Sequence, residues 1–137
     1  MAKTKSPQAT LSDMLEDIKR IASDPDYRDE EEEAPSSAAV NHLQSILEKA
    51  YKQFGDSLPR GEVSCFAGEM SVTWTLRDRK LRVDIASDGS PRMHFGSFES
   101  DLVNRYTHER PQQDERILAR VDWLVQPSDA PTGCRAL

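Results

Sequence analysis

The stretch that decides the fold is residues 70–89, MSVTWTLRDRKLRVDIASDG. Its apolar residues recur at every second position, first at Met70, Val72, Trp74 and Leu76 and then at Leu81, Val83 and Ile85. A period of two is typical of strands that bury one face and leave the other in water. The polar break Arg77–Lys80 separates the two runs, and the turn signal Asp88-Gly89 follows the second, because glycine tolerates a positive φ. The stretch therefore predicts a β-hairpin with Trp74 in the core.

Three helices are predicted around this hairpin. The capping signal Thr10–Asp13 and apolar residues at helical spacing predict the first helix over roughly 11–23. A longer apolar stripe preceded by serines, which are good N-caps, predicts the second helix over roughly 37–54. The third helix begins near Gln112 and ends before Pro127.

Further strands complete the predicted sheet. Residues 62–67, EVSCFA, are predicted to form a first strand, and a shorter strand is predicted near 92–95. Residues 99–111 are polar, and an irregular segment is predicted there. The expected fold class is α+β, with two N-terminal helices, an antiparallel meander of three to four strands and a C-terminal helix. The second and third helices are expected to cover the apolar face of the sheet.

The chain of 137 residues has the length of one domain. We expect a disordered tail at residues 1–9, a single domain over 10–126 and a disordered tail at 127–137. The N-terminus has no apolar segment of a secretory signal, and no run is long enough to span a membrane. Two cysteines without metal or disulfide spacing are typical of reduced thiols. A cytoplasmic location is therefore expected.

The net charge of −6 lies mostly in residues 1–59, whereas residues 60–110 are neutral. A protein whose main partner is a nucleic acid usually carries a basic surplus. The charge therefore disfavours DNA or RNA as the main partner, and it favours a protein that binds a basic partner.

Seven acidic side chains gather in the segment Asp24–Glu33, DPDYRDEEEE. A solvated loop is one interpretation of such a run, and a contact for a basic partner through Glu30, Glu31, Glu32 and Glu33 is another. A calcium loop of the helix–loop–helix kind would require a glycine at its sharp turn, and this segment has none. No metal and no cofactor are expected.

Basic residues gather around the hairpin. The candidate partner-binding residues are Arg77, Arg79, Lys80, Arg82 and Arg92. Such a cluster can bind phosphates or an acidic protein surface. Acidic residues are interleaved with it, so a solvated face with cross-strand ion pairs is the alternative.

No catalytic motif accompanies the fold. The chain contains no G-x-S-x-G, H-E-x-x-H, C-x-x-C or phosphate-binding glycine loop. Cys65, His94 and Asp84 are the residues from which a catalytic trio could be drawn, and His42 is interpreted as an ordinary boundary histidine. A protein without enzymatic activity is expected.

The order of elements resembles a loose group of small uncharacterised bacterial proteins. Members share a loop of the type D-W-D-G-x-G-A-x-x-P-S, a hairpin with a tryptophan in its first strand, a D-G turn and a final helix ending in W-L. The corresponding stretches here are Asp24–Ser36, Gly68–Trp74, Leu81–Ile85, Asp88-Gly89 and Trp123-Leu124. Tyr27 stands in place of the loop tryptophan, and acidic residues replace its glycines. The resemblance implies an accessory protein of a mobile or defence locus.

These observations favour a small protein-binding module, of the antitoxin or immunity kind, which neutralises a basic toxin or nuclease. The alternative is a nucleic-acid-associated regulator that uses the basic hairpin tip, residues 77–80. The sequence does not identify the partner.

Overall fold

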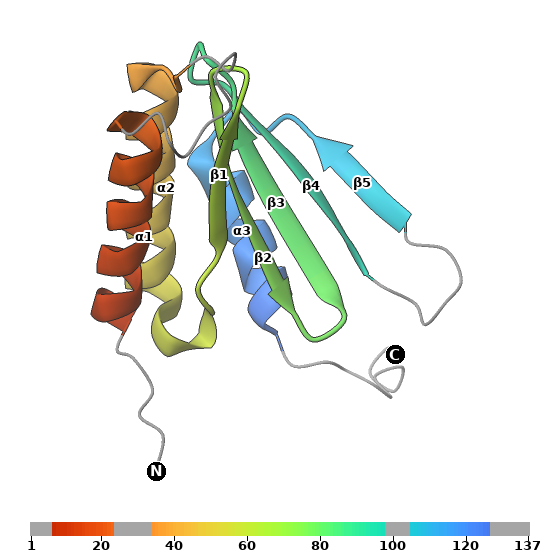
Figure 1. Cartoon of the computed structure of the whole chain (residues 1–137). Helices are drawn as coiled ribbons and strands as arrows, with labels where there is room; N and C mark the ends of the chain where they lie inside the picture. The colour runs from red at the N-terminus through yellow and green to blue at the C-terminus, as the bar shows by residue number, and fades with distance from the viewer. Residues whose placement is uncertain (1–6, 24–33, 98–104, 127–137) are drawn as a thin grey trace, which may run out of the picture.

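The computed structural model of the chain describes residues 7–23, 34–97 and 105–126 (Figure 1). The elements follow in the order α1 (Pro7–Ser23), α2 (Ser37–Phe54), the short 3-10 helix η2 (Gly55–Ser57), β1 (Glu62–Phe66), β2 (Glu69–Leu76), β3 (Arg79–Ile85), β4 (Pro91–Ser97), β5 (Arg105–Glu109) and α3 (Asp114–Val125). The fold is α+β, as predicted, with two N-terminal helices, an antiparallel sheet and a C-terminal helix.

The sheet is a meander in which each strand pairs with the next in the chain, in the order β1-β2-β3-β4-β5. Strands β2 and β3 form the predicted hairpin, and their antiparallel register places Trp74 opposite Leu81. The turn between them is shorter than the predicted polar break, because only Arg77 and Asp78 lie outside the strands. Arg77 has a φ of 56°, which a tight turn between twisted strands requires.

A fifth strand, β5, lies in the segment that was predicted to be irregular. It pairs with β4, with His108 opposite His94 and Thr107 opposite Phe95. The sheet therefore has five strands rather than three or four. This edge strand is held by backbone pairing to β4, so it forms without the apolar alternation that would have predicted it.

The helix boundaries agree with the predictions for α2 and differ for α1. Ser36 caps α2 by accepting a hydrogen bond from the backbone N–H of Ala39 at 3.0 Å. Helix α1 begins at Pro7, ahead of the predicted start at residue 11 and inside the predicted tail. Proline suits the first turn of a helix because the missing N–H would have no partner there. The acidic segment 24–33 and the C-terminal tail lie outside the described residues.

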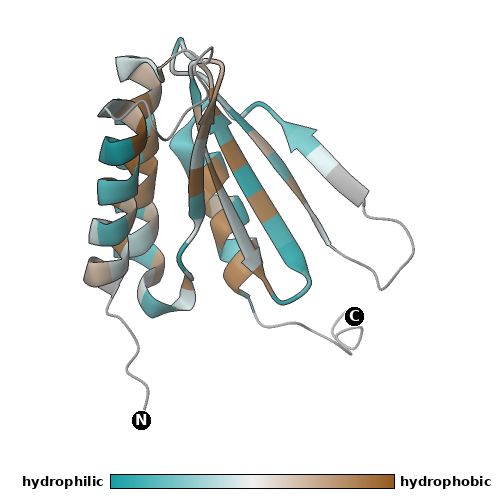
Figure 2. Ribbon diagram, in the orientation of Figure 1, coloured by the Kyte–Doolittle hydropathy of each residue, from teal (hydrophilic) through white to brown (hydrophobic). Residues whose placement is uncertain are grey.

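Helices α2 and α3 pack on one face of the sheet, and α1 packs on α2 and beside β1 (Figure 1). The predicted inward residues are buried, and Trp74 is 0% exposed, which confirms it as a core residue. Figure 2 shows hydrophobic and hydrophilic bands alternating along β3, as expected for a strand with one covered face. Within the described ranges, no helix combines the length and the apolar character needed to span a membrane.

Candidate functional site

The sheet face opposite α2 and α3 carries polar side chains, and no described helix or strand packs over it. We call this surface the open face. Because residues paired across antiparallel strands share a face, the register places on it Ser71, Thr73, Thr75, Lys80, Arg82, Asp84, Arg92, His94 and His108. The residues between them, such as Val83 and Met93, are buried under the helices.

A hollow of about 570 Å³ lies in the open face, and it is the strongest candidate site of the described chain. Its lining residues are Lys80, Arg82, Asp84, Arg92, His94 and His108, from β3, β4 and β5. A smaller hollow of about 190 Å³ shares Arg92, His94 and His108 with it and extends toward Arg110. Five of the six side chains that line the larger hollow carry a positive charge or can acquire one.

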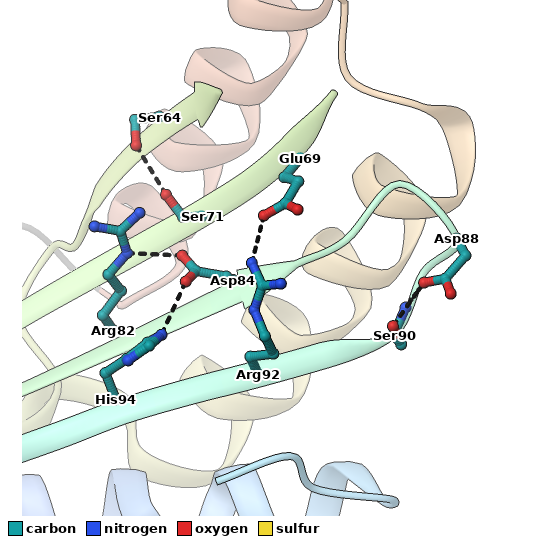
Figure 3. A network of polar contacts seen from close by, with 9 residues as sticks. All are labelled: Ser64, Glu69, Ser71, Arg82, Asp84, Asp88, Ser90, Arg92 and His94. Atoms are coloured by element: carbon teal, nitrogen blue, oxygen red, sulfur yellow. Dashed lines mark hydrogen bonds and ion pairs between the residues drawn. The ribbon is translucent and has the colours of Figure 1, made fainter. Parts of the chain in front are cut away.

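Asp84 organises the centre of this hollow. Its residue exposure is only 5%. The Nε of Arg82 donates to Asp84 Oδ1 at 2.7 Å, and Nε2 of His94 lies 3.2 Å from Asp84 Oδ2 (Figure 3). A buried carboxylate without such partners would be costly. Both oxygens of Asp84 are therefore engaged in holding side chains of the open face.

His94 is the less exposed of the two imidazoles in the hollow. A carboxylate only accepts hydrogen bonds, so the contact with Asp84 places a proton on Nε2 of His94. Burial lowers the pKa of His94, nearby His108 and Arg82 lower it further, and the charge of Asp84 opposes these effects. The rings of His94 and His108 meet edge to face, with centroids 4.3 Å apart. The neutral form of His94 is thus favoured while the hollow holds no anion.

The remaining charges of the open face are partly paired. Arg92 donates to Glu69 Oε1 at 2.6 Å, and the hydroxyls of Ser64 and Ser71 lie 2.8 Å apart (Figure 3). Within the described part of the chain, the side chain of Lys80 has no hydrogen-bond or ion-pair partner. Three fixed cations and one carboxylate, Asp84, line the hollow, and Glu69 pairs with Arg92, so the hollow retains one positive charge when its histidines are neutral.

Two of the predicted partner-binding residues do not belong to the open face. Arg77 donates to the backbone carbonyl of Gln126 at 2.7 Å, just beyond the end of α3. Arg79 donates to the carbonyl of Trp123, and its guanidinium lies 5.2 Å from the centroid of the Trp123 ring. The short turn places Arg79 on the helix-covered face, and the C-terminal end of a helix attracts cations. The prediction that Arg77 and Arg79 belong to the same binding surface as Arg82 is therefore wrong.

The three residues from which a catalytic trio could be drawn do not come together. Asp84 and His94 are in contact on the open face, but Cys65 packs against the core on the opposite face of the sheet. The side-chain alternation of β1 accounts for this, because Val63 and Cys65 turn toward the helices. In the ranges that the structure describes, no group of three His, Cys, Asp or Glu residues has metal-binding geometry.

His42 has a more specific role than the sequence suggested. Its Nδ1 lies 2.6 Å from the carbonyl of Gly89, and its Nε2 lies 2.8 Å from Asp114 Oδ1. Lys49 donates to the other oxygen of Asp114 at 2.9 Å. These contacts join α2 to the β3–β4 turn and to the first turn of α3. His42 thus links three elements.

His108 is the residue of the site that the sequence analysis missed. It lies on β5, whose sequence Arg-Tyr-Thr-His-Glu has no apolar period to identify a strand. Its separation from His94 along the chain gave no reason to pair the two. The candidate residues Glu30–Glu33 lie outside the described chain.

No protein family, no curated protein and no solved structure matches this chain.

Proposed function

We propose that this protein is a non-enzymatic binding module whose open face binds an acidic surface of a protein partner. The observation that carries the proposal is the convergence of Lys80, Arg82, Arg92, His94 and His108 around one hollow that no described element covers. Interfaces gain specificity and association rate from complementary charge. The residual positive charge of this hollow favours carboxylates or other anions on the partner.

The hydrogen bonds and ion pairs within the open face support a role in binding rather than in catalysis. Asp84 uses both oxygens to orient Arg82 and His94, so these side chains are held in place before a partner arrives. Preorganised side chains lose less conformational entropy on binding. An antitoxin or immunity protein is one form of such a module. In that case an acidic surface of the toxin would bind the open face, and a basic region of the toxin would bind the acidic segment 24–33.

The test is quantitative capture of partners from the native host with three forms of the protein. The wild type is compared with Lys80→Glu/His108→Glu on the open face and with Lys19→Glu/Arg20→Glu on α1. The ion pairs of Asp84 are with Arg82 and His94 and not with the two substituted residues, so the open-face variant is expected to fold, which circular dichroism verifies. The proposal expects one protein to be captured by the wild type and the α1 variant and lost from the open-face variant. Equal capture by all three forms would refute it.

A nucleic-acid-associated regulator remains the alternative, because cations on a sheet face can also contact phosphates. Two of the hairpin-tip residues on which that idea rested, Arg77 and Arg79, instead bind carbonyls at the end of α3. A gel shift at low salt with the same three forms separates the two functions. Binding that is lost with rising salt and with the open-face variant would favour the regulator.

A further inference from the structure

We propose that the hollow of the open face binds one phosphate group, held between the guanidinium of Arg82 and the imidazole of His108. The inference rests on the proposed function and names the chemistry that the partner presents. A phosphate monoester carries close to two negative charges and three strong acceptor oxygens. The hollow offers donors from three strands around a volume of about 570 Å³, within the range of ligand sites.

Arg82 is the side chain best prepared for such a group. Its Nε–H is already bonded to Asp84 at 2.7 Å, which fixes the plane of the guanidinium. The two terminal nitrogens have no partner among the described residues, and the side chain is 49% exposed. Arginine presents its donors in a rigid fork that matches the oxygens of a phosphate. The bond to Asp84 thus orients Arg82 and leaves its outer edge for a ligand.

The histidine pair supplies donors that depend on protonation. His94 keeps one nitrogen on Asp84, so a second proton would be carried by Nδ1. The charged groups that line its hollow are Arg82, Asp84, Lys80 and Arg92, together with the ring of His108. Without an anion, burial and the neighbouring cations hold the pKa of His94 down. A bound dianion offsets those cations, and binding is therefore expected to take up protons.

A tetrahedral anion suits this hollow better than a metal ion or a single carboxylate. Lys80, Arg82 and Arg92 surround the two histidines, and their charges disfavour a cation at that point. A carboxylate has two oxygens, whereas Lys80, Arg82 and His108 offer donors from separate directions. A phosphate group, with three acceptor oxygens, can bind more of these donors at once than a carboxylate can.

The direct experiment is a titration of the whole protein with inorganic phosphate, followed by ¹H–¹⁵N NMR at constant ionic strength. Saturable shifts are expected around Arg82, His94 and His108, and the affinity for the phosphate dianion should be about threefold or more higher near pH 6 than near pH 7.5. Arg82→Gln retains a donor for Asp84 and should weaken binding about tenfold or more. His94→Gln can keep a donor toward Asp84 and should abolish most of the pH dependence, whereas His108→Gln removes one donor to the phosphate and should weaken binding. The matched control Arg20→Gln on α1 should bind like the wild type.

Absence of saturable shifts at both pH values, or equal weakening by Arg20→Gln, would overturn the inference. Two further probes identify the source of the phosphate. A short phosphoserine peptide should bind more tightly than inorganic phosphate. The same peptide with glutamate in place of the phosphoserine should bind more weakly than the phosphorylated peptide. Tighter binding of inorganic phosphate than of the peptide would overturn the assignment to a partner protein in favour of a small ligand.

Phosphatase treatment separates this inference from the proposed function. If a partner captured through the open face is released by treatment with a broad-specificity phosphatase, both proposals are supported. If capture depends on Lys80 and His108 but survives phosphatase, the phosphate inference fails and the binding module stands.

Discussion

Replacing Tyr51 by phenylalanine should destabilise the protein by removing one buried hydroxyl that serves two partners. Trp74 is fully buried, and its Nε1–H donates to the Tyr51 hydroxyl at 3.1 Å. That hydroxyl in turn donates to the carbonyl of Pro59. The pKa of Tyr51 is raised, because burial of the hydroxyl outweighs its hydrogen bonds to Trp74 and the backbone, which act in the opposite direction.

The magnitude follows from the two groups that lose a partner. A buried donor without an acceptor costs about 1–3 kcal/mol, and the lost hydrogen bond to Pro59 adds about 1 kcal/mol. The free energy of unfolding should therefore fall by about 2–4 kcal/mol in Tyr51→Phe.

The coupling between the two aromatic residues provides the sharper test. In a Trp74→Phe background no indole N–H requires an acceptor, so Tyr51→Phe should cost only about 1 kcal/mol. The difference, about 1–3 kcal/mol, is the coupling energy of a double-mutant cycle. Urea unfolding followed by far-ultraviolet circular dichroism measures all four proteins without relying on tryptophan fluorescence.

Trp123→Phe is the matched control, because the ring of Trp123 contacts Phe95 and Arg79, whereas the partners of the Tyr51 hydroxyl are Trp74 and Pro59. In that background Tyr51→Phe should keep its full cost. If the cost of Tyr51→Phe is the same with Trp74, with Trp74→Phe and with Trp123→Phe, then the Trp74 N–H does not depend on Tyr51 and the reasoning is refuted.

Three further predictions concern the core, the docking of α3 and acid stability. Gly61→Ala should lower the free energy of unfolding by about 1–3 kcal/mol in urea titrations, because its Cβ would lie 2.7 Å from Val72 Cγ2. A variant as stable as the wild type would show that neighbouring side chains shift to accommodate the methyl group. Arg79→Ala should lower the thermal midpoint by an amount equivalent to about 1–2 kcal/mol, since it removes a charged hydrogen bond and a cation–π contact at Trp123; an unchanged midpoint would contradict its role in holding α3. Burial would raise the pKa of Asp114, but hydrogen bonds from α2 outweigh it and lower that pKa. The unfolded chain then binds the Asp114 proton more readily, so this contribution is present above about pH 4 and is lost as the pH falls through the folded pKa. Asp114→Asn should flatten that part of the acid-unfolding profile, and an identical profile would count against the assignment.

The hairpin and the long helix were predictable because their patterns are local. The alternation around Trp74 and the stripe of α2 follow from which side chains must leave water, and the structure places both as expected. Strand β5 was not predictable in this way. It lies at the edge of the sheet, its described residues Thr107 and His108 are exposed, and backbone pairing to β4 holds it there.

The basic residues show how a sequence cluster can divide in space. Arg79 and Lys80 are neighbours in the chain, but the side chains of a strand alternate between its faces. Arg79 therefore lies beneath the sheet and binds α3, whereas Lys80 lines the hollow of the open face. The two-residue turn at Arg77–Asp78 brings Arg79 into the strand, where it shares the side of the buried Leu81 two positions later.

The sequence by itself determined the α+β class, the position of the hairpin and the burial of Trp74, because hydrophobic periodicity is a property of each segment alone. The tertiary structure decided the composition of the open face. Asp84, His94 and His108 meet there because strand register joins segments that are distant in the chain, and register is established only when the strands pair. Met70–Gly89 thus specifies one face of the sheet through its apolar residues, while the site on the other face depends on β4 and β5.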